Sequence, residues 1–183
     1  MMKITKAKIK EYAKIFDERY GKDYVEKEMK DWLKNNRYLD REGFIKIGMW
    51  KSPRPKKHYK NNDDLTVKRI TRHSFATDSE KERIECLLDL NGVGYPVAST
   101  ILHFAFPDRY PIMDFRAIWS LGLKQPKYYC FDFWQKYCAE IKAISERVGE
   151  NIRTIDKALW QYSVKNQRKS NSRNSEQAVC SPA

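Results

Sequence analysis

Apolar residues recur at intervals of three and four along most of the chain, which is the spacing of one face of an α-helix. No sequence repeat is visible, and no segment shows the strict alternation of a half-buried β-strand. The pattern therefore predicts an all-helical fold, a bundle of several helices. The expected helices cover residues 5–20, 24–36, 40–50, 64–75, a segment that begins after Thr77, a segment from Pro96 to Pro107, and residues 115–121, 130–148 and 151–165.

Capping residues mark several of the expected helix ends. Asp23 is a candidate N-cap of the second helix, and Thr77 with Glu80 forms the signature of a capping box. Pro96 suits the first turn of a helix, where the N–H that proline lacks would have no intrahelical partner. The segment 51–62 is basic and contains two prolines, so we expect it to be a loop.

A chain of 183 residues suggests one domain, or at most two small ones. We expect a single all-helical domain over residues 1–164. From residue 165 the sequence becomes polar and rich in serine and asparagine, which favours a disordered tail over residues 165–183.

The charge of the chain narrows the class of partner. Lysine and arginine number 36 against 24 acidic residues, which gives a net charge of +12. Part of the excess is local, since the segment 51–60 holds five basic side chains and no acidic one: Lys51, Arg54, Lys56, Lys57 and Lys60. Such a field attracts polyanions, so nucleic acid is the leading partner, with His58 and Tyr59 interleaved among the cations. An anionic membrane, or a solvated loop that serves only solubility, is the alternative.

The cysteines and the apolar segments exclude several other classes. Cys86, Cys130, Cys138 and Cys180 form no CxxC pair, which argues against a zinc ribbon and an iron–sulfur cluster. We expect free thiols in a reducing cytosol, and no metal site. The N-terminal residues lack an apolar signal core, and the longest apolar stretch, YPVASTILHFAF, is too short to span a membrane. The sequence therefore predicts a soluble cytoplasmic protein, associated with the nucleoid if the host is prokaryotic.

Two glycines one residue apart interrupt the helical pattern in LNGVGYPVAS, residues 90–99. Gly92 and Gly94 allow positive φ and the close approach of another backbone, while a new helix begins directly after them. The amide groups at such a helix start favour an anion, and on a basic protein a DNA phosphate is the obvious one. An ordinary tight turn between two helices is the structural alternative.

The segment LNGVGYPVASTILHFAFPDRYPIMDFRAIWSLG, residues 90–122, resembles the central segment of the helix-hairpin-helix DNA glycosylase superfamily, which includes endonuclease III and the adenine-mismatch glycosylases. The matching positions are Leu90, Gly92, Val93 and Gly94 in the hairpin and Ala98 in the helix that follows. Asp114 lies 22 residues after Gly92, the offset of the catalytic aspartate in that family. The resemblance implies a glycosylase-like all-helical fold with a helix-hairpin-helix motif. It also implies sequence-independent contacts of Gly92, Val93 and Gly94 with the backbone of double-stranded DNA.

Two departures from the family matter for the chemistry. Bifunctional members carry a lysine two residues after the second glycine of the hairpin, and this chain has Pro96 there, so that lyase mechanism is unavailable. The four-cysteine cluster of endonuclease III is also missing, so we expect no iron–sulfur cluster and no other cofactor. Relatives hold a monovalent cation on the hairpin carbonyls, and the resemblance allows one at the same place in this chain.

Asp114 is the residue on which an enzymatic activity would depend. Cleavage of an N-glycosidic bond passes through an oxocarbenium-like transition state, which a carboxylate can stabilise while it holds or activates a water. The structural alternative is a helix N-cap, a role that aspartate favours and that does not exclude catalysis. The extruded base needs aromatic neighbours, and the candidates are Trp50, Tyr110, Trp119 and Trp160.

These observations lead to two functional hypotheses. The first is a monomeric, monofunctional DNA N-glycosylase of base excision repair, with Asp114 as the catalytic residue and Lys51, Arg54, Lys56 and Lys57 on the DNA backbone. The second is a non-catalytic helix-hairpin-helix module that binds DNA only. An unrelated basic adaptor that binds no DNA is a third interpretation.

Overall fold

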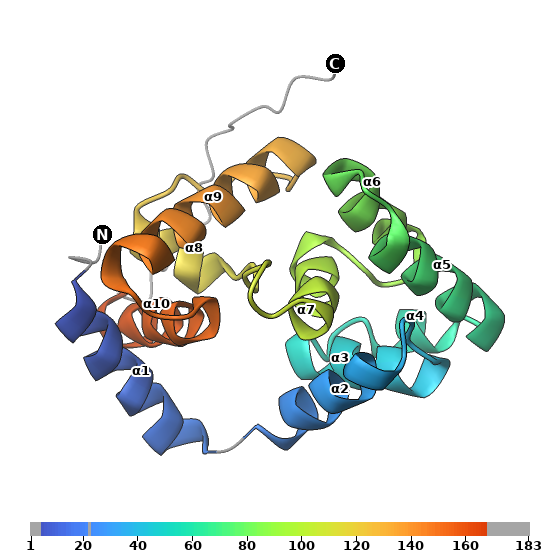
Figure 1. Cartoon of the computed structure of the whole chain (residues 1–183), viewed down its shortest axis with the longest axis horizontal. Helices are drawn as coiled ribbons and strands as arrows, with labels where there is room; N and C mark the ends of the chain where they lie inside the picture. Colours follow the sequence, from blue (N-terminus) through green and yellow to red (C-terminus); the bar gives the residue numbers. More distant parts are fainter. Residues whose placement is uncertain (1–4, 22, 168–183) are drawn as a thin grey trace. The chain divides into compact units, whose positions relative to one another are not determined.

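The computed structural model describes residues 5–21 and 23–167, and their regular structure is entirely helical (Figure 1). The all-α prediction is therefore confirmed. In chain order the elements are α1 (Lys6–Tyr20), α2 (Tyr24–Asn35), α3 (Arg41–Lys51), α4 (Lys56–Lys60), α5 (Asp64–Ala76), α6 (Glu80–Glu85), the 3₁₀-helix η1 (Cys86–Asp89), α7 (Tyr95–Ala105), α8 (Phe115–Leu121), α9 (Phe131–Val148) and α10 (Ile152–Asn166).

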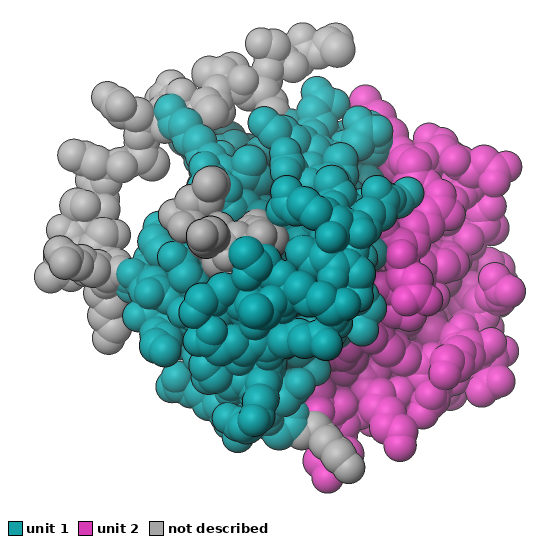
Figure 2. All heavy atoms as spheres, turned by 60° about the vertical axis from the view of Figure 1, so that its left-hand side comes forward, with its two compact units in different colours: residues 1–21, 113–183 teal, residues 22–112 magenta. Residues whose placement is uncertain are grey.

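The chain divides into two compact units, which Figure 2 distinguishes by colour. Unit 1 is built from both ends of the sequence, residues 1–21 and 113–183, and unit 2 from residues 22–112. The expectation of one domain over residues 1–164 stays a prediction.

In unit 1 the first and last helices of the chain lie side by side: α1 packs along α10, which also contacts α8 and α9 (Figure 1). The apolar stripes of these helices form the core, in which Trp134 and Tyr137 are the largest fully buried side chains. The helix ends follow the expected chemistry, because Gly149 ends α9 in the left-handed conformation and Asn151 caps α10.

In unit 2 the helix α7 forms the centre, with α2, α3 and α6 packed against it. Nine of its 11 residues are buried, Ser99, Thr100 and His103 among them, so α7 is enclosed on nearly all sides. The cap of α2 is Asp23, as predicted, since its side chain accepts a hydrogen bond from the backbone N–H of Glu26 at 2.9 Å.

Three local predictions need correction. The segment 51–62 is not only a loop, because it contains the short helix α4. The N-cap of α6 is Ser79 rather than Thr77; the Ser79 hydroxyl accepts from Glu82 N, whereas Thr77 donates its hydroxyl proton to the Glu82 carboxylate. The helix α10 runs to Asn166, past the expected boundary at 165, and the rest of the predicted tail, residues 168–183, lies outside the described residues.

The prediction of free thiols is wrong for one cysteine. Cys86 and Cys138 are thiols, whereas Cys130 is disulfide-bonded. Burial raises the pKa of the Cys86 thiol.

Among the described helices, none has the length and apolar character needed to cross a membrane.

Candidate nucleic-acid interface

The glycine turn of unit 2 joins η1 to α7 through residues in two different conformations. Gly92 has φ of +88°, which a residue with a side chain rarely adopts. Gly94 is exposed, has an extended backbone and is the N-cap of α7. It has no side chain that could accept a hydrogen bond from an N–H of the first turn. Pro96 lies in that first turn, as predicted. No capping side chain covers the start of α7, and of its first amides Pro96 lacks the N–H while the Val97 N–H donates to the Gly94 carbonyl at 2.9 Å.

A pair of asparagines fastens this turn to the end of α4. The backbone N–H of Asn91 donates to Asn62 Oδ1 at 2.8 Å, and Asn62 Nδ2 donates back to the Asn91 carbonyl at 3.1 Å. The same Nδ2 reaches the carbonyls of Tyr59 at 3.0 Å and His58 at 3.2 Å. Asn62 is 3% exposed, so these bonds replace water for an otherwise buried amide. They bring the glycine turn against the basic segment, from which it is about 30 residues away in sequence.

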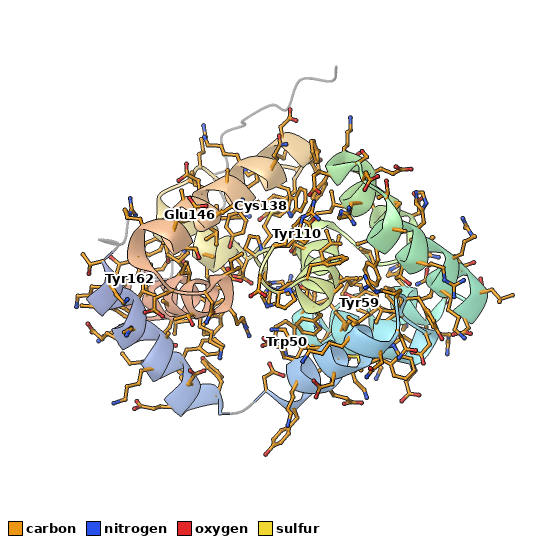
Figure 3. All side chains as sticks on the ribbon, in the orientation of Figure 1. Trp50, Tyr59, Tyr110, Cys138, Glu146 and Tyr162 are labelled. Carbon is orange, nitrogen blue, oxygen red and sulfur yellow. The ribbon has the colours of Figure 1, made fainter. Side chains whose placement is uncertain are left out.

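The ring of Tyr59, which is labelled in Figure 3, lies close to both Gly92 of the turn and Gly48 of α3. A Cβ at Gly92 would lie 2.9 Å from Tyr59 Cδ1, and one at Gly48 would lie 2.9 Å from Cε2 on the opposite edge of the ring. The Tyr59 hydroxyl donates to the Ser52 carbonyl at 3.0 Å, and burial raises its pKa. Tyr59 is fully buried, so the expectation that it lies among the cations as a DNA contact is wrong.

The basic side chains of this segment differ in exposure. Arg54, Lys56 and Lys57 are exposed, and within the described part of the chain no ion pair neutralises them. Lys51 is half-buried in the last turn of α3 and is less available. Arg41 adds a further cation, because its guanidinium donates to the Lys60 carbonyl at 2.8 Å and to the Asn62 carbonyl at 2.9 Å. The C-terminal carbonyls of α4 thus have a cationic partner, which favours this short helix.

The tip of the turn, Val93, is half-buried, and its N–H donates to the Leu90 carbonyl at 3.0 Å. In unit 2 the structure therefore brings together the glycine turn (Gly92, Val93, Gly94) and the helix that carries Lys56 and Lys57. Asn62, which connects the two, is a residue that the sequence pattern does not single out.

Asp114 belongs to unit 1, where it is the N-cap of α8, as predicted. Its Oδ1 accepts a hydrogen bond from the backbone N–H of Arg116 at 2.9 Å, and the residue is half-buried. Its charge is felt by two tyrosines: burial and then Asp114 raise the pKa of Tyr129, and burial, Asp156 and Asp114 raise that of Tyr137. Both phenols consequently stay neutral near the carboxylate. A catalytic role for Asp114 stays a prediction.

Two of the four candidate aromatic residues for a base pocket, Trp50 and Tyr110, have structural partners in unit 2. Trp50 donates its indole N–H to the Asp23 carboxylate at 2.5 Å and packs against Phe104. Tyr110 is buried and donates its hydroxyl to the Glu80 carboxylate at 2.8 Å. Burial raises the pKa of Tyr110 well above its usual value, with Glu80 adding to the rise. These contacts account for the positions of the Trp50 and Tyr110 rings without a bound nucleic-acid base.

The other two candidates, Trp119 and Trp160, lie in unit 1. Trp119 stacks on Tyr162, with ring centroids 6.0 Å apart, and both rings are half-buried. Trp160 meets Phe16 edge to face at 5.5 Å. The sequence pattern does not single out Phe115, which follows Asp114 directly. The Phe115 side chain is 47% exposed.

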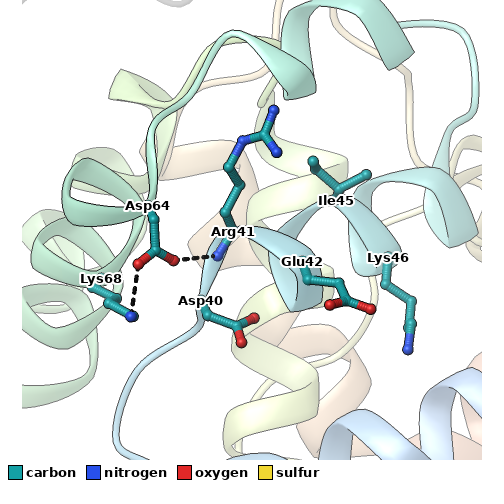
Figure 4. Close-up of a pocket in the computed structure, with 7 residues that line it drawn as sticks. All are labelled: Asp40, Arg41, Glu42, Ile45, Lys46, Asp64 and Lys68. Atoms are coloured by element: carbon teal, nitrogen blue, oxygen red, sulfur yellow. Dashed lines mark hydrogen bonds and ion pairs between the residues drawn. The ribbon is translucent and has the colours of Figure 1, made fainter.

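Figure 4 shows a depression of about 600 Å³ in unit 2, lined by residues of α3 and α5. Two of its charged side chains pair with each other: Lys68 Nζ lies 2.7 Å from the Asp64 carboxylate, which also accepts from the Arg41 backbone N–H at 2.9 Å. Lys46 pairs with Glu28 at 2.6 Å. We assign the depression no role.

The described residues contain no group of three or more His, Cys, Asp or Glu side chains that could hold a metal ion. Comparison of the chain with protein-family models, curated proteins and solved structures finds no match. The function must therefore be argued from the geometry of the two units.

Proposed function

We propose that this protein binds double-stranded DNA and acts in base excision repair as a monofunctional DNA N-glycosylase of the helix-hairpin-helix class. The observation that carries the proposal is the Asn62–Asn91 pair, which holds the glycine turn of unit 2 beside the basic helix α4. The start of α7 has no side-chain cap, and the cations Arg54, Lys56 and Lys57 beside it have no ion pair among the described residues. Together they form a surface suited to successive phosphates of a DNA strand.

The contacts with DNA are sequence-independent in this proposal. The backbone of the glycine turn at the start of α7, which is exposed at Gly94, binds one phosphate, and Arg54, Lys56 and Lys57 bind others along the DNA backbone. Binding of this kind gains its free energy from the release of counterions, so it weakens steeply as salt rises. A monovalent cation on the carbonyls of the turn, as in the family that the sequence resembles, is compatible with the proposal but not required by it.

Asp114 supplies the chemistry in this proposal. Its carboxylate stabilises the positive charge that develops on the sugar as the N-glycosidic bond breaks, or orients the water that attacks. The bond from Arg116 N to Oδ1 fixes the orientation of the side chain, which a preorganised electrostatic group requires. Pro96 at the position of the family's lysine leaves no amine there for a Schiff base, so the reaction ends at the abasic site.

The second candidate function is a helix-hairpin-helix module that binds DNA without cleaving it. It is favoured by the capping bond of Asp114, which explains why an aspartate stands before α8 without any chemistry. Both hypotheses predict a monomer, and the cytoplasm, or the nucleoid in a prokaryotic host, as the place of action.

The experiment that separates them uses duplexes that each contain one damaged or mismatched base. Each duplex is incubated with the full chain and treated with hot alkali, which breaks the strand at abasic sites. The glycosylase hypothesis predicts breaks at one class of lesion, and Asp114→Asn is expected to abolish them with DNA affinity unchanged. Asparagine is an equally good N-cap, so this variant keeps α8 intact.

The matched control is Asp132→Asn, an exposed aspartate in the first turn of α9 in the same unit. It removes the same charge and is expected to leave cleavage unchanged. If no lesion yields breaks while the duplexes bind tightly, the module is the correct function. If the chain binds no DNA at low salt, both hypotheses are wrong.

A further inference from the structure

Unit 1 carries an aromatic and cationic row that begins beside Asp114. The guanidinium carbon of Arg116 lies 5.0 Å from the ring centre of Phe115 and 5.4 Å from that of Trp160. A planar cation thus lies over two rings that come from different helices, α8 and α10, which is the geometry of a cation–π contact.

The row continues onto α1. Trp160 meets Phe16 at 5.5 Å and Tyr20 at 5.2 Å, both edge to face, and these two rings lie 4.9 Å apart. The row therefore holds four aromatic rings from three helices. Phe16, Tyr20 and Trp160 contact one another. Arg116 lies between Trp160 and the fourth ring, Phe115.

Two rings of the row are exposed to solvent. Phe115 is 47% exposed and Tyr20 is 45% exposed, whereas the aromatic residues of the unit 1 core, such as Trp134 and Tyr137, are buried. A row that served only to pack α1 and α8 on α10 would gain more by covering these rings, because exposed apolar area contributes nothing to the stability of the fold. The exposure points to a second role.

The charges along the row are mostly positive. Arg19 lies 5.5 Å from the ring centre of Tyr20, and Arg153 and Lys157 each lie 5.8 Å from that of Phe16. Lys157 also forms an ion pair with Asp17 at 2.7 Å. With Arg116, four cations therefore lie against the rings of the row, which suits a partner that is negatively charged and planar.

We propose that this row, defined by Phe115, Arg116, Trp160, Phe16 and Tyr20, binds unpaired nucleotides of single-stranded DNA. A nucleic acid base stacks on an exposed ring whatever its sequence, while its phosphate is held by the cations between the rings. The inference rests on the proposed function in one respect, the choice of DNA as the polymer. In a glycosylase, the row would hold an extruded nucleotide beside the carboxylate of Asp114.

The proposal is tested by fluorescence polarisation with a labelled oligothymidylate of about 12 nucleotides, a length that covers one site of this kind. Phe115→Ala and Phe115→Leu both remove the ring, and leucine keeps the apolar volume. Each is expected to weaken binding of the single strand about tenfold, in line with the loss of one stacked base. Affinity for a duplex of the same length is expected to stay the same.

Tyr128→Ala is the matched control. Tyr128 is 74% exposed in the same unit and has Lys127 over its ring at 5.3 Å, but it stands outside the row. Its removal is expected to leave oligothymidylate affinity within twofold of that of the unmodified chain. Thermal melting of each variant confirms that the fold is intact.

Equal losses in Phe115→Ala and Tyr128→Ala, or no loss in either Phe115 variant, would overturn the proposal. So would tight binding of polyglutamate with none of oligothymidylate, which would assign the row to an acidic protein. The result is separate from that of the lesion assay. A chain that cleaves no lesion but loses single-strand affinity in Phe115→Ala keeps this inference and loses the glycosylase, and the reverse outcome does the opposite.

Discussion

At the scale of single residues, the two glycines of the turn perform different tasks. Gly92 is required by the backbone and by the ring of Tyr59, since its φ is positive and a Cβ would lie 2.9 Å from Tyr59 Cδ1. Gly94 is extended, and the nearest atom to a Cβ there is Pro96 Cδ at 3.8 Å, which is an ordinary contact. The structure therefore separates a glycine needed for folding from one that leaves a helix start open.

Alanine substitution at each glycine tests this difference. Gly92→Ala is expected to lower the free energy of unfolding by about 1–3 kcal/mol from backbone strain, with the clash adding to it. Gly94→Ala is expected to change it by less than about 0.5 kcal/mol, while the new methyl group at the start of α7 weakens duplex binding severalfold. Urea denaturation and filter binding measure the two effects. Full duplex affinity in a folded Gly94→Ala variant would show that the start of α7 binds no phosphate.

At the scale of elements, the helix α4 and the glycine turn act as one structural piece. They are joined by the side chain of Asn62 and by the ring of Tyr59, both buried, rather than by a continuous apolar face. The orientation of Lys56 and Lys57 relative to the turn depends on these two contacts.

Replacement of Asn62 by alanine removes the hydrogen bonds to the turn and leaves the Asn91 N–H without its acceptor. The expected loss is about 1–3 kcal/mol of stability, the usual consequence of an unsatisfied buried group, together with weaker duplex binding. Asn61→Ala is the control, because Asn61 is exposed at the C-cap of α4. Chemical denaturation of both variants is the measurement, and equal stability of the two would contradict the role of the asparagine pair.

The sequence predicts the long helices well, because each has an apolar face that repeats every three or four residues and a capping residue at its end. Asp114 before α8 and Gly149 after α9 are such cases. The sequence does not predict α4, because five residues are too few to show a periodicity. The one apolar residue of α4, Tyr59, is buried against Gly48 and Gly92, which belong to other segments of the chain. The Asn62–Asn91 pair escapes prediction for the same reason.

At the scale of the whole molecule, the net charge of +12 becomes informative only when the paired cations are set apart from the others. Several lysines have acidic neighbours within a helix turn, among them Lys14 with Glu18 and Lys34 with Asp31. The cations of the segment 51–60 that face solvent have none among the described residues. The segment 51–60 is therefore one place where exposed positive charge can attract a polyanion.

The salt dependence of duplex binding measures that field. Replacement of Arg54, Lys56 and Lys57 by glutamine is expected to reduce the slope of log affinity against log salt concentration by roughly 0.9 for each phosphate that the protein no longer neutralises. Lys14→Gln with Lys34→Gln is the control, which changes the net charge at paired sites and is expected to leave the slope nearly unchanged. The same reduction per charge removed in the two sets, of three and two cations, would mean that only the total charge matters.

The division into units is also beyond the reach of a sequence pattern. Periodicity shows that residues 6–20 and 152–166 are amphipathic helices, but it does not show that the first helix of the chain packs along the last. The aromatic row of unit 1 depends on this return of the chain, since Phe16 and Trp160 come from those two helices. For the same reason, spacing alone could identify Asp114 as a candidate but not the aromatic row that begins at the next residue, Phe115.

The ring of Tyr59 has a consequence for motion. Its two edges face the backbones at Gly48 and Gly92, which leave room for the ring edge but not for a Cβ. A half-turn of the ring about its axis carries both edges through the space between those backbones, so rotation requires the two segments to separate for a moment. The rotation rate of this one side chain therefore follows the transient opening of α3, α4 and the glycine turn.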